Sequence, residues 1–144
     1  EAERDDLIAA YHRRLFSGVA MEESKAARLW ASWENALASV HSAGFMGESP
    51  SEYSRAFARL ENHYFINAAF LETDGWIEQN RDRIAHISAD IVQGQFDMIC
   101  PPISSQRLPR GWERARLQIM PLAGHALSEA GISEALVAAM DRLR

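Results

Sequence analysis

The sequence has few of the features that mark secreted, membrane-spanning or disulfide-linked proteins. Its 144 residues include a single cysteine, Cys100, which excludes an internal disulfide and favours a reducing compartment. No apolar run approaches the roughly 18 residues that a membrane helix needs, and no signal-peptide pattern is present. We therefore expect a cytoplasmic protein that does not cross a membrane.

Positive charge and metal ligands are also scarce. The 15 Lys and Arg residues are outnumbered by 20 Asp and Glu, the formal net charge is −5, and no Lys/Arg cluster interrupts this balance. Such a surface argues against nucleic acid as a partner. The segment Glu61-Asn62-His63 lacks the i, i+4 histidine pair of a zinc helix, and no other His or Cys grouping has ligand spacing. We expect neither a metal nor a cofactor.

The rest of the composition is that of an ordinary globular domain. The chain is 47% hydrophobic and 24% charged, and its length suits one domain with a core of its own. It begins at Glu1 without an initiator Met, in what reads as the acid-rich first turn of a helix. This start favours a piece of a longer protein over a complete protein released from a tag.

Hydrophobic periodicity divides the chain near Arg83 into an all-helical part and an α/β part. Apolar residues at helical spacing predict helices over 3–16, 22–43, 51–71 and 76–83. The later pattern predicts strands over 89–94 and 115–120, alternating with helices over 102–108 and 131–143. Strands separated by helices imply parallel pairing. Because parallel sheets normally have more strands and are covered on both faces, the α/β part is expected to need a partner sheet.

The two longest predicted helices carry stripes of large apolar residues, a pattern typical of helix surfaces that face a core. The stripe of the 22–43 helix contains Leu29, Trp30, Trp33, Leu37 and Val40. The stripe of the 51–71 helix contains Tyr53, Phe57, Leu60, Tyr64, Ala68 and Leu71.

Each predicted strand is followed by a residue suited to acid–base chemistry. Asp97 follows the first strand in a Gly-containing turn before Pro101, and His125 comes just past the end of the second. Open α/β folds place their sites at this carboxyl edge of the sheet. An Asp and then a His at consecutive strand ends match the second half of a Ser…Asp…His triad in α/β-hydrolase order. Either residue alone fits an ordinary turn, and only the pair in this order favours a triad.

Glu34 and Glu61 form a second pair of candidates, on two neighbouring predicted helices. Glu61 lies four residues before Phe65, and Glu34 lies four residues after Trp30, so each carboxylate borders an aromatic side chain. A carboxylate in such surroundings is costly unless it has a partner.

Two interpretations of these acids remain open. In the first, an arginine such as Arg55 or Arg59 pairs with the carboxylate and the contact is structural. In the second, the two acids converge on the ammonium group of a ligand, and the aromatic rings form an apolar wall beside it.

The nucleophile of a triad is missing from the sequence. No serine lies in a G-x-S-x-G context, and there is no Gly-rich oxyanion loop of the His-Gly-Gly type. An Asp–His pair without its nucleophile does not perform acyl transfer by that mechanism. Cys100 could serve as a nucleophile, but its place between Asp97 and Pro101 favours a small apolar contact at the mouth of the site.

Four segments in chain order resemble bacterial proline iminopeptidases (prolyl aminopeptidases). They are residues 30–34 (WASWE), 58–67 (ARLENHYFIN), 94–101 (GQFDMICP) and 123–125 (AGH). The 58–67 segment is similar to the lid-helix signature of that family and is more specific than the strand-end segments. The resemblance extends over essentially the whole chain and concerns the lid plus the C-terminal portion of these enzymes.

In that family an α/β-hydrolase sheet carries a Ser-Asp-His triad, and a helical lid supplies acids for the free imino group of an N-terminal proline. The resemblance therefore implies an α/β fold with a helical lid over 1–83 and a C-terminal hydrolase segment, two parallel strands with helices, over 84–144. It implies Asp97 as triad acid and His125 as general base. The same resemblance makes Glu34, Glu61, Phe65 and Cys100 substrate-binding residues: the two acids anchor the charged N-terminus, Phe65 lines the pyrrolidine pocket, and Cys100 lies beside it.

The expected partners are peptides with an N-terminal proline and the missing N-terminal half of the hydrolase, without which the chain is expected to be inactive. The sequence departs from the family at Gln93, where a His is common. Two other functions remain open. One is a related amidase or esterase acting on another small amine-bearing substrate. The other is a non-catalytic module that forms a homo-oligomer through its unpaired strand edge.

Overall fold

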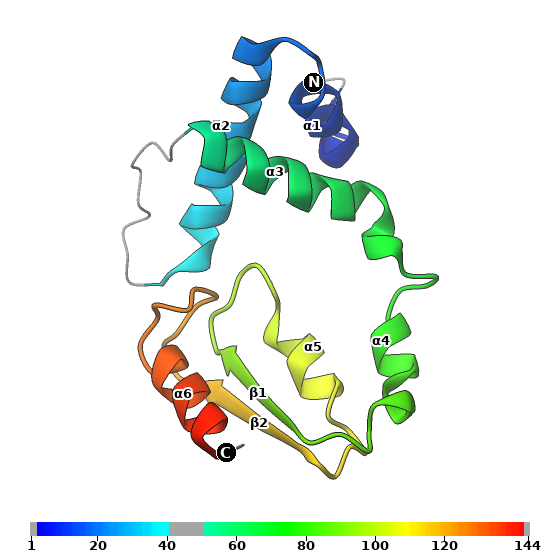
Figure 1. Cartoon of the computed structure of the whole chain (residues 1–144), viewed down its shortest axis with the longest axis vertical. Helices are drawn as coiled ribbons and strands as arrows, with labels where there is room; N and C mark the ends of the chain where they lie inside the picture. The colour runs from blue at the N-terminus through cyan, green and yellow to red at the C-terminus, as the bar shows by residue number, and fades with distance from the viewer. Residues whose placement is uncertain (1–2, 41–50, 143–144) are drawn as a thin grey trace. The chain divides into compact units, whose positions relative to one another are not determined.

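The computed structural model describes residues 3–40 and 51–142, and these form two compact units (Figure 1). The first unit contains residues 3–35 and 51–72, and the second contains residues 36–40 and 73–142. The described chain is mostly helical with a two-stranded parallel sheet, as predicted. None of its described helices is both long and apolar enough to cross a membrane.

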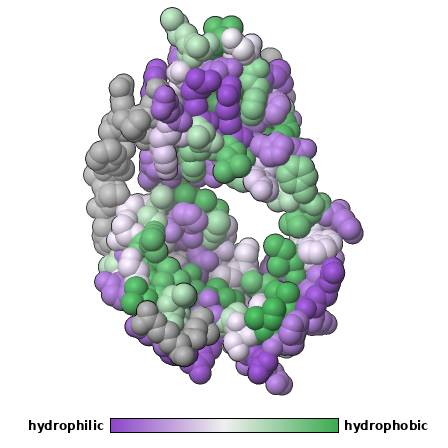
Figure 2. All heavy atoms as spheres, viewed as in Figure 1, coloured by the Kyte–Doolittle hydropathy of each residue, from purple (hydrophilic) through white to green (hydrophobic). Residues whose placement is uncertain are grey.

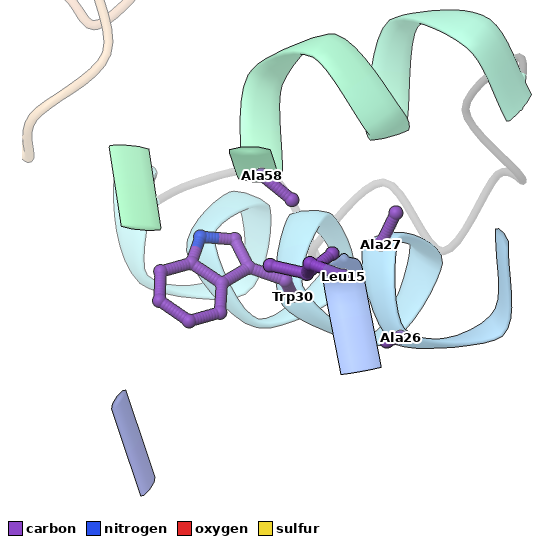
Figure 3. Close-up of a cluster of buried hydrophobic side chains, with 5 residues drawn as sticks. All are labelled: Leu15, Ala26, Ala27, Trp30 and Ala58. Atoms are coloured by element: carbon purple, nitrogen blue, oxygen red, sulfur yellow. The ribbon is translucent and has the colours of Figure 1, made fainter. Parts of the chain in front are cut away.

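The first unit is built from α1 (Leu7–Leu15), α2 (Ala20–Ala38) and α3 (Ser51–Ile66), followed by the short 3-10 helix η1 (Ala68–Phe70). The helix α1 begins where the Asp6 side chain accepts a hydrogen bond from the Ala9 amide at 2.9 Å, which satisfies one of the free N–H groups of the first turn. The core of this unit consists of Leu15, Ala26, Ala27, Trp30 and Ala58 (Figure 3).

The predicted apolar stripes of α2 and α3 match the buried faces of these helices only in part: Trp30 belongs to the core and Phe57 packs against it, but other members of the stripes are exposed. Trp33 is 66% exposed and Leu60 is 63% exposed, whereas the alanines of the core are almost fully buried. The core of this unit is formed mainly by small side chains, Ala26 and Ala27 of α2 and Ala58 of α3, which pack around Leu15 of α1 and Trp30. Large apolar side chains consequently remain on the surface of both units, where they appear as green patches in Figure 2.

The helices α2 and α3 end several residues earlier than predicted, and so does α4 (Trp76–Gln79), which the 3-10 helix η2 (Arg81–Arg83) follows within the predicted 76–83 range. The helix α2 ends at Ala38, so Ser39 and Val40 lie outside it, and the predicted residues 41–43 fall outside the described part of the chain. The helix α3 ends at Ile66, where the Asn67 side chain donates to the His63 carbonyl at 2.8 Å. Residues 68–70 then adopt positive φ angles of 48°, 53° and 59°, a left-handed turn that no α-helix can continue through.

The second unit has the alternating order that the sequence predicts. It contains α4 (Trp76–Gln79), η2 (Arg81–Arg83), β1 (Ala89–Gly94), α5 (Pro102–Arg107), β2 (Ala115–Met120) and α6 (Ile132–Arg142). The two strands have the predicted bounds and pair in parallel, with Ala89 opposite Ala115 and Gly94 opposite Met120. Ile132, Ala135 and Ala139 form the buried face of α6, at the i, i+3, i+7 spacing of a helix packed on one side.

We expect Leu15→Ala to lower the free energy of unfolding of the first unit by about 2–5 kcal/mol, because it leaves a cavity among small side chains that cannot fill it. Hydrogen exchange of the amides of α1, α2 and α3 measures this loss separately from the second unit. The matched control is Leu29→Ala, at a position that is 53% exposed on α2, where a change of no more than about 0.5 kcal/mol is expected. Equal losses in the two variants would contradict this description of the core.

Candidate active site

The carboxylate of Asp97 lies in the turn that follows β1 and accepts hydrogen bonds on both oxygens. Its Oδ1 accepts the backbone N–H groups of Ile99 at 3.0 Å and Cys100 at 2.7 Å. Its Oδ2 accepts from Gln93 Nε2 at 2.9 Å and lies 3.0 Å from His125 Nδ1. The side chain is 5% exposed, so these contacts replace the water that an ionised carboxylate would otherwise need.

The surroundings of Asp97 lower its pKa below the ordinary value. Burial alone would raise the pKa, since it disfavours the charged form. The hydrogen bonds from the Cys100 amide, the His125 ring and the Ile99 amide, together with the charge of a protonated His125, favour the carboxylate more strongly. Asp97 is therefore an acceptor on both oxygens, which assigns the proton of this contact to His125 Nδ1.

The loop after β2 carries His125 to the same edge of the sheet as Asp97. The backbone of Gly94 at the end of β1 lies so close to this loop that a Cβ there would overlap the Gly124 carbonyl oxygen. The Phe96 amide also donates to the Ala123 carbonyl at 2.9 Å. The His125 side chain is 41% exposed. With Nδ1–H donated to Asp97, the basic atom of the imidazole is Nε2, the arrangement that a general base requires.

Gln93 is a contributor to this site that sequence reasoning treated only as a departure from a family pattern. Its side-chain amide donates to Asp97 Oδ2 and also to the Cys100 carbonyl at 3.1 Å. Gln93 thereby closes the turn of residues 94–100 around the carboxylate. Its position directly before Gly94 could have suggested that Gln93 lies near the Asp97 turn. Nothing in the sequence indicated that its side chain reaches Asp97.

Cys100 takes part in this turn through its backbone. Its amide donates to Asp97 and its carbonyl accepts from Gln93, which accounts for its place in the turn. Cys100 is an exposed residue and forms no disulfide. Whether its thiol contacts a substrate stays a prediction.

The other candidate residues lie in the first unit, around a pocket of about 290 Å³. The pocket is lined by Leu7, Ile8, Tyr11, Trp30, Trp33, Glu34 and Phe65. The indole N–H of Trp30 donates to Glu61 Oε2 at 2.6 Å, so the second acid lies directly behind one wall of the pocket. The rings of Trp30 and Phe65 have centroids 6.0 Å apart. The structure thus brings one predicted acid and the predicted aromatic residue into a single pocket, with the other acid bonded to its wall.

The pairing of Glu61 with Arg55 or Arg59, which the structural interpretation offered, is not formed. Both arginines instead contact Glu23, which is buried on α2, at 2.9 Å and 2.8 Å. Glu23, in the first turn of α2, lies within reach of both arginines of α3. Glu61 instead lies against the indole N–H of Trp30. Among the described residues no group of three or more His, Cys, Asp or Glu is placed to hold a metal ion.

The low pKa of Asp97 makes a prediction about stability. Its folded pKa lies below the unfolded value of about 3.9, so ionisation stabilises the fold above that value and the contribution is lost as the pH falls through the folded pKa. We expect Asp97→Asn to lower the free energy of unfolding of the second unit at neutral pH by about 1–3 kcal/mol. Urea denaturation at a series of pH values should show the gap from wild type closing on acidification.

The control for this experiment is Asp82→Asn, because the Asp82 side chain is 92% exposed. Its stability should follow that of the wild type at every pH. A gap between Asp97→Asn and wild type that stays constant into strong acid would contradict the assignment of a low pKa to Asp97.

The chain is similar in sequence to several known proteins over nearly all of its length. No family model matches the chain. A probable proline iminopeptidase of Leptolyngbya boryana is 45% identical over 142 residues, which cover 97% of this chain and 44% of the relative. A proline iminopeptidase of Xanthomonas citri is 40% identical over 141 residues, 96% of this chain and 45% of the relative. A proline iminopeptidase of Arabidopsis thaliana is also 40% identical, over 140 residues that cover 37% of its length.

The chain thus spans less than half the length of these curated relatives. Over nearly all of its own length, it is similar to a portion of the proline iminopeptidases.

Proposed function

We propose that this chain is the lid and C-terminal part of a serine-type proline iminopeptidase, an α/β-hydrolase that releases proline from the N-terminus of peptides. The observation that carries the proposal is the contact between Asp97 and His125, made at the ends of two parallel strands in a chain similar to enzymes of that name. Residues 1–83 are the lid region in this proposal. Residues 84–144 contribute two strands to a larger sheet, whose other strands come from the N-terminal half of the hydrolase.

The chemistry follows from the tautomer of His125. Its Nε2 takes the proton of a serine hydroxyl, supplied by the N-terminal half, as the serine oxygen attacks the prolyl carbonyl carbon. The imidazolium then gives this proton to the leaving amine as the peptide bond breaks and the acyl-enzyme forms. Water is activated by Nε2 in the same way and releases proline. Asp97 keeps the ring oriented and stabilises the imidazolium, and its four hydrogen-bond contacts support that role without a proton transfer to it.

Specificity is assigned to the pocket of the first unit. A free N-terminal proline carries a positive charge on a small apolar ring, so it needs a carboxylate beside an apolar wall. Glu34 lines the pocket together with Trp30 and Phe65, and Glu61 is bonded to Trp30. Because the Trp30 N–H is neutral, its hydrogen bond leaves the negative charge of Glu61 uncancelled and able to attract a cation.

The substrates and the cofactor requirement of the protein follow from the same chemistry, and its compartment follows from its cysteine content. Peptides with an N-terminal proline are its substrates, and no cofactor is required by serine-type chemistry. The single Cys100 fits a reducing compartment, and we assign the protein to the cytoplasm on that ground.

The first test is hydrolysis of proline p-nitroanilide by the chain, alone and mixed with the N-terminal half of a related proline iminopeptidase. Activity is expected only in the mixture. His125→Ala should reduce it by about 10³-fold or more, since removal of a triad member removes most of the rate enhancement. Asp82→Asn, at a side chain that is 92% exposed, is the control and should retain activity.

Other outcomes of this assay distinguish the alternatives. Activity of the chain alone, lost in Cys100→Ser, would identify a cysteine nucleophile and contradict the serine mechanism. Hydrolysis of simple esters or of other amino-acid anilides at equal rates would favour a related amidase or esterase. A folded chain that remains inactive in the mixture contradicts the proposal.

The anchor role of the two acids makes a separate prediction. Glu34→Gln and Glu61→Gln should each lower kcat/KM for proline p-nitroanilide by at least about tenfold, because each removes a negative charge near the proposed position of the substrate cation. Hydrolysis of the N-acetylated substrate, which has no cation, should not change. Glu52→Gln, at an exposed position of α3, is the matched control. Equal losses on both substrates would show that the acids act on the fold and not on the charge.

A further inference from the structure

The loop that carries His125 is bound not only by the turn that holds Asp97 but also by the residues that end α2. The Ala38 carbonyl accepts two consecutive backbone N–H groups, from His125 at 2.9 Å and from Ala126 at 2.8 Å. This carbonyl is one of those that a helix end leaves without an intrahelical partner. A Cβ at Gly124 would lie 2.9 Å from the same oxygen, so only a glycine allows the two backbones to approach this closely. Both segments belong to the second unit.

A buried acid, Glu129, joins the same two segments. Its Oε2 accepts the Gly124 amide at 2.9 Å and the Val40 amide at 3.3 Å, and its Oε1 accepts the Ser39 hydroxyl. Glu129 is 5% exposed. One of its donors precedes His125 by a single residue, and the other two follow directly after the end of α2.

The contacts of Ala38, Ser39 and Val40 explain why α2 stops at Ala38. An additional helical turn would place the Ser39 and Val40 groups on helical partners and remove them from Glu129. The chain instead turns so that the Val40 amide and the Ser39 hydroxyl donate to the Glu129 carboxylate. The Ala38 carbonyl then accepts from the His125 and Ala126 amides. A carboxylate suits this place because it accepts several hydrogen bonds at once and binds backbone N–H groups more strongly than a neutral acceptor does.

We propose that Glu129 is a positioning residue for His125. By holding Gly124 and the residues after α2 together, it sets the direction in which the His125 backbone leaves the loop, and so the distance from the imidazole to Asp97. This inference rests on the proposed function, in which His125 is the general base. It assigns to Glu129 an effect on the orientation of the ring, separate from any effect on folding.

The test compares three variants by the tautomer of His125 and by kinetics. The two-bond ¹H–¹⁵N spectrum of the imidazole, recorded on the chain itself, identifies the protonated nitrogen without a substrate. The wild type should show His125 protonated at Nδ1. Glu129→Gln keeps one acceptor oxygen and replaces the other with an NH2 group, which cannot accept from the Gly124 and Val40 amides or the Ser39 hydroxyl, so it should shift the ring toward a mixture of tautomers. Ser39→Ala removes one donor and should shift the tautomer in the same direction by less.

Glu134→Gln is the matched control, because Glu134 is an exposed acid on α6. It should leave the tautomer unchanged. In the mixture with the N-terminal half, Glu129→Gln should lower kcat for proline p-nitroanilide by about 100-fold with KM unchanged, as expected when a catalytic group is displaced by about 1 Å. Far-UV circular dichroism establishes that each variant is folded.

A folded Glu129→Gln chain with the wild-type tautomer and wild-type kcat overturns the inference. If Glu129→Gln does not fold, Ser39→Ala decides: an unchanged tautomer and kcat overturn the inference, and a partial shift with reduced kcat supports it. Failure of the proposed function is distinguishable, because it removes prolyl hydrolysis by the wild-type mixture while the tautomer measurement on the chain still tests the role of Glu129.

Discussion

The close approach of two loops at the carboxyl ends of β1 and β2 is the constraint on which the candidate site depends. Parallel pairing places Gly94 opposite Met120, so the turn after β1 and the loop after β2 leave the sheet side by side. The absence of a side chain at Gly94 lets the backbones come into contact. Without that approach, Asp97 and His125 would each be an ordinary loop residue, and the 3.0 Å contact between their side chains would not form.

The elements of the fold could be predicted from the sequence because their causes are local. A short β-branched run before a Gly-containing turn predicts the first strand, an apolar run before Pro121 predicts the second, and the structure has both at the predicted bounds. The ends of α2 and α3 could not be predicted in the same way. The end of α2 depends on hydrogen bonds to residues about ninety positions further along the chain, such as the contact from Val40 to Glu129. No local pattern contains that information.

The candidate site, like the fold, could be predicted from the sequence only where its causes are local. The contact between Asp97 and His125 could be predicted from chain order and strand ends, because parallel strands bring their carboxyl ends to one edge of the sheet. The partners of individual side chains were not predictable. Gln93, Trp30 and Glu129 all act through side chains whose direction depends on tertiary packing. The sequence analysis found Trp30 on the buried face of α2 but missed the buried alanines of α2 and α3, since alanine contributes little to an apolar stripe.

The buried and half-buried carboxylates discussed above differ in the groups that contact them, and these contacts indicate different roles. Glu23 is held by two arginines, so its charge is matched within the protein and is not available to a ligand. Asp97 accepts hydrogen bonds from two backbone amides, the Gln93 amide and His125, and Glu129 accepts hydrogen bonds from the Gly124 and Val40 amides and the Ser39 hydroxyl, so each carboxylate is fixed in direction by several donors. Glu61 receives its hydrogen bond from the neutral indole N–H of Trp30. A neutral donor orients a carboxylate without cancelling its charge, and an acid oriented in this way beside an aromatic pocket is suited to a cation that arrives from solution.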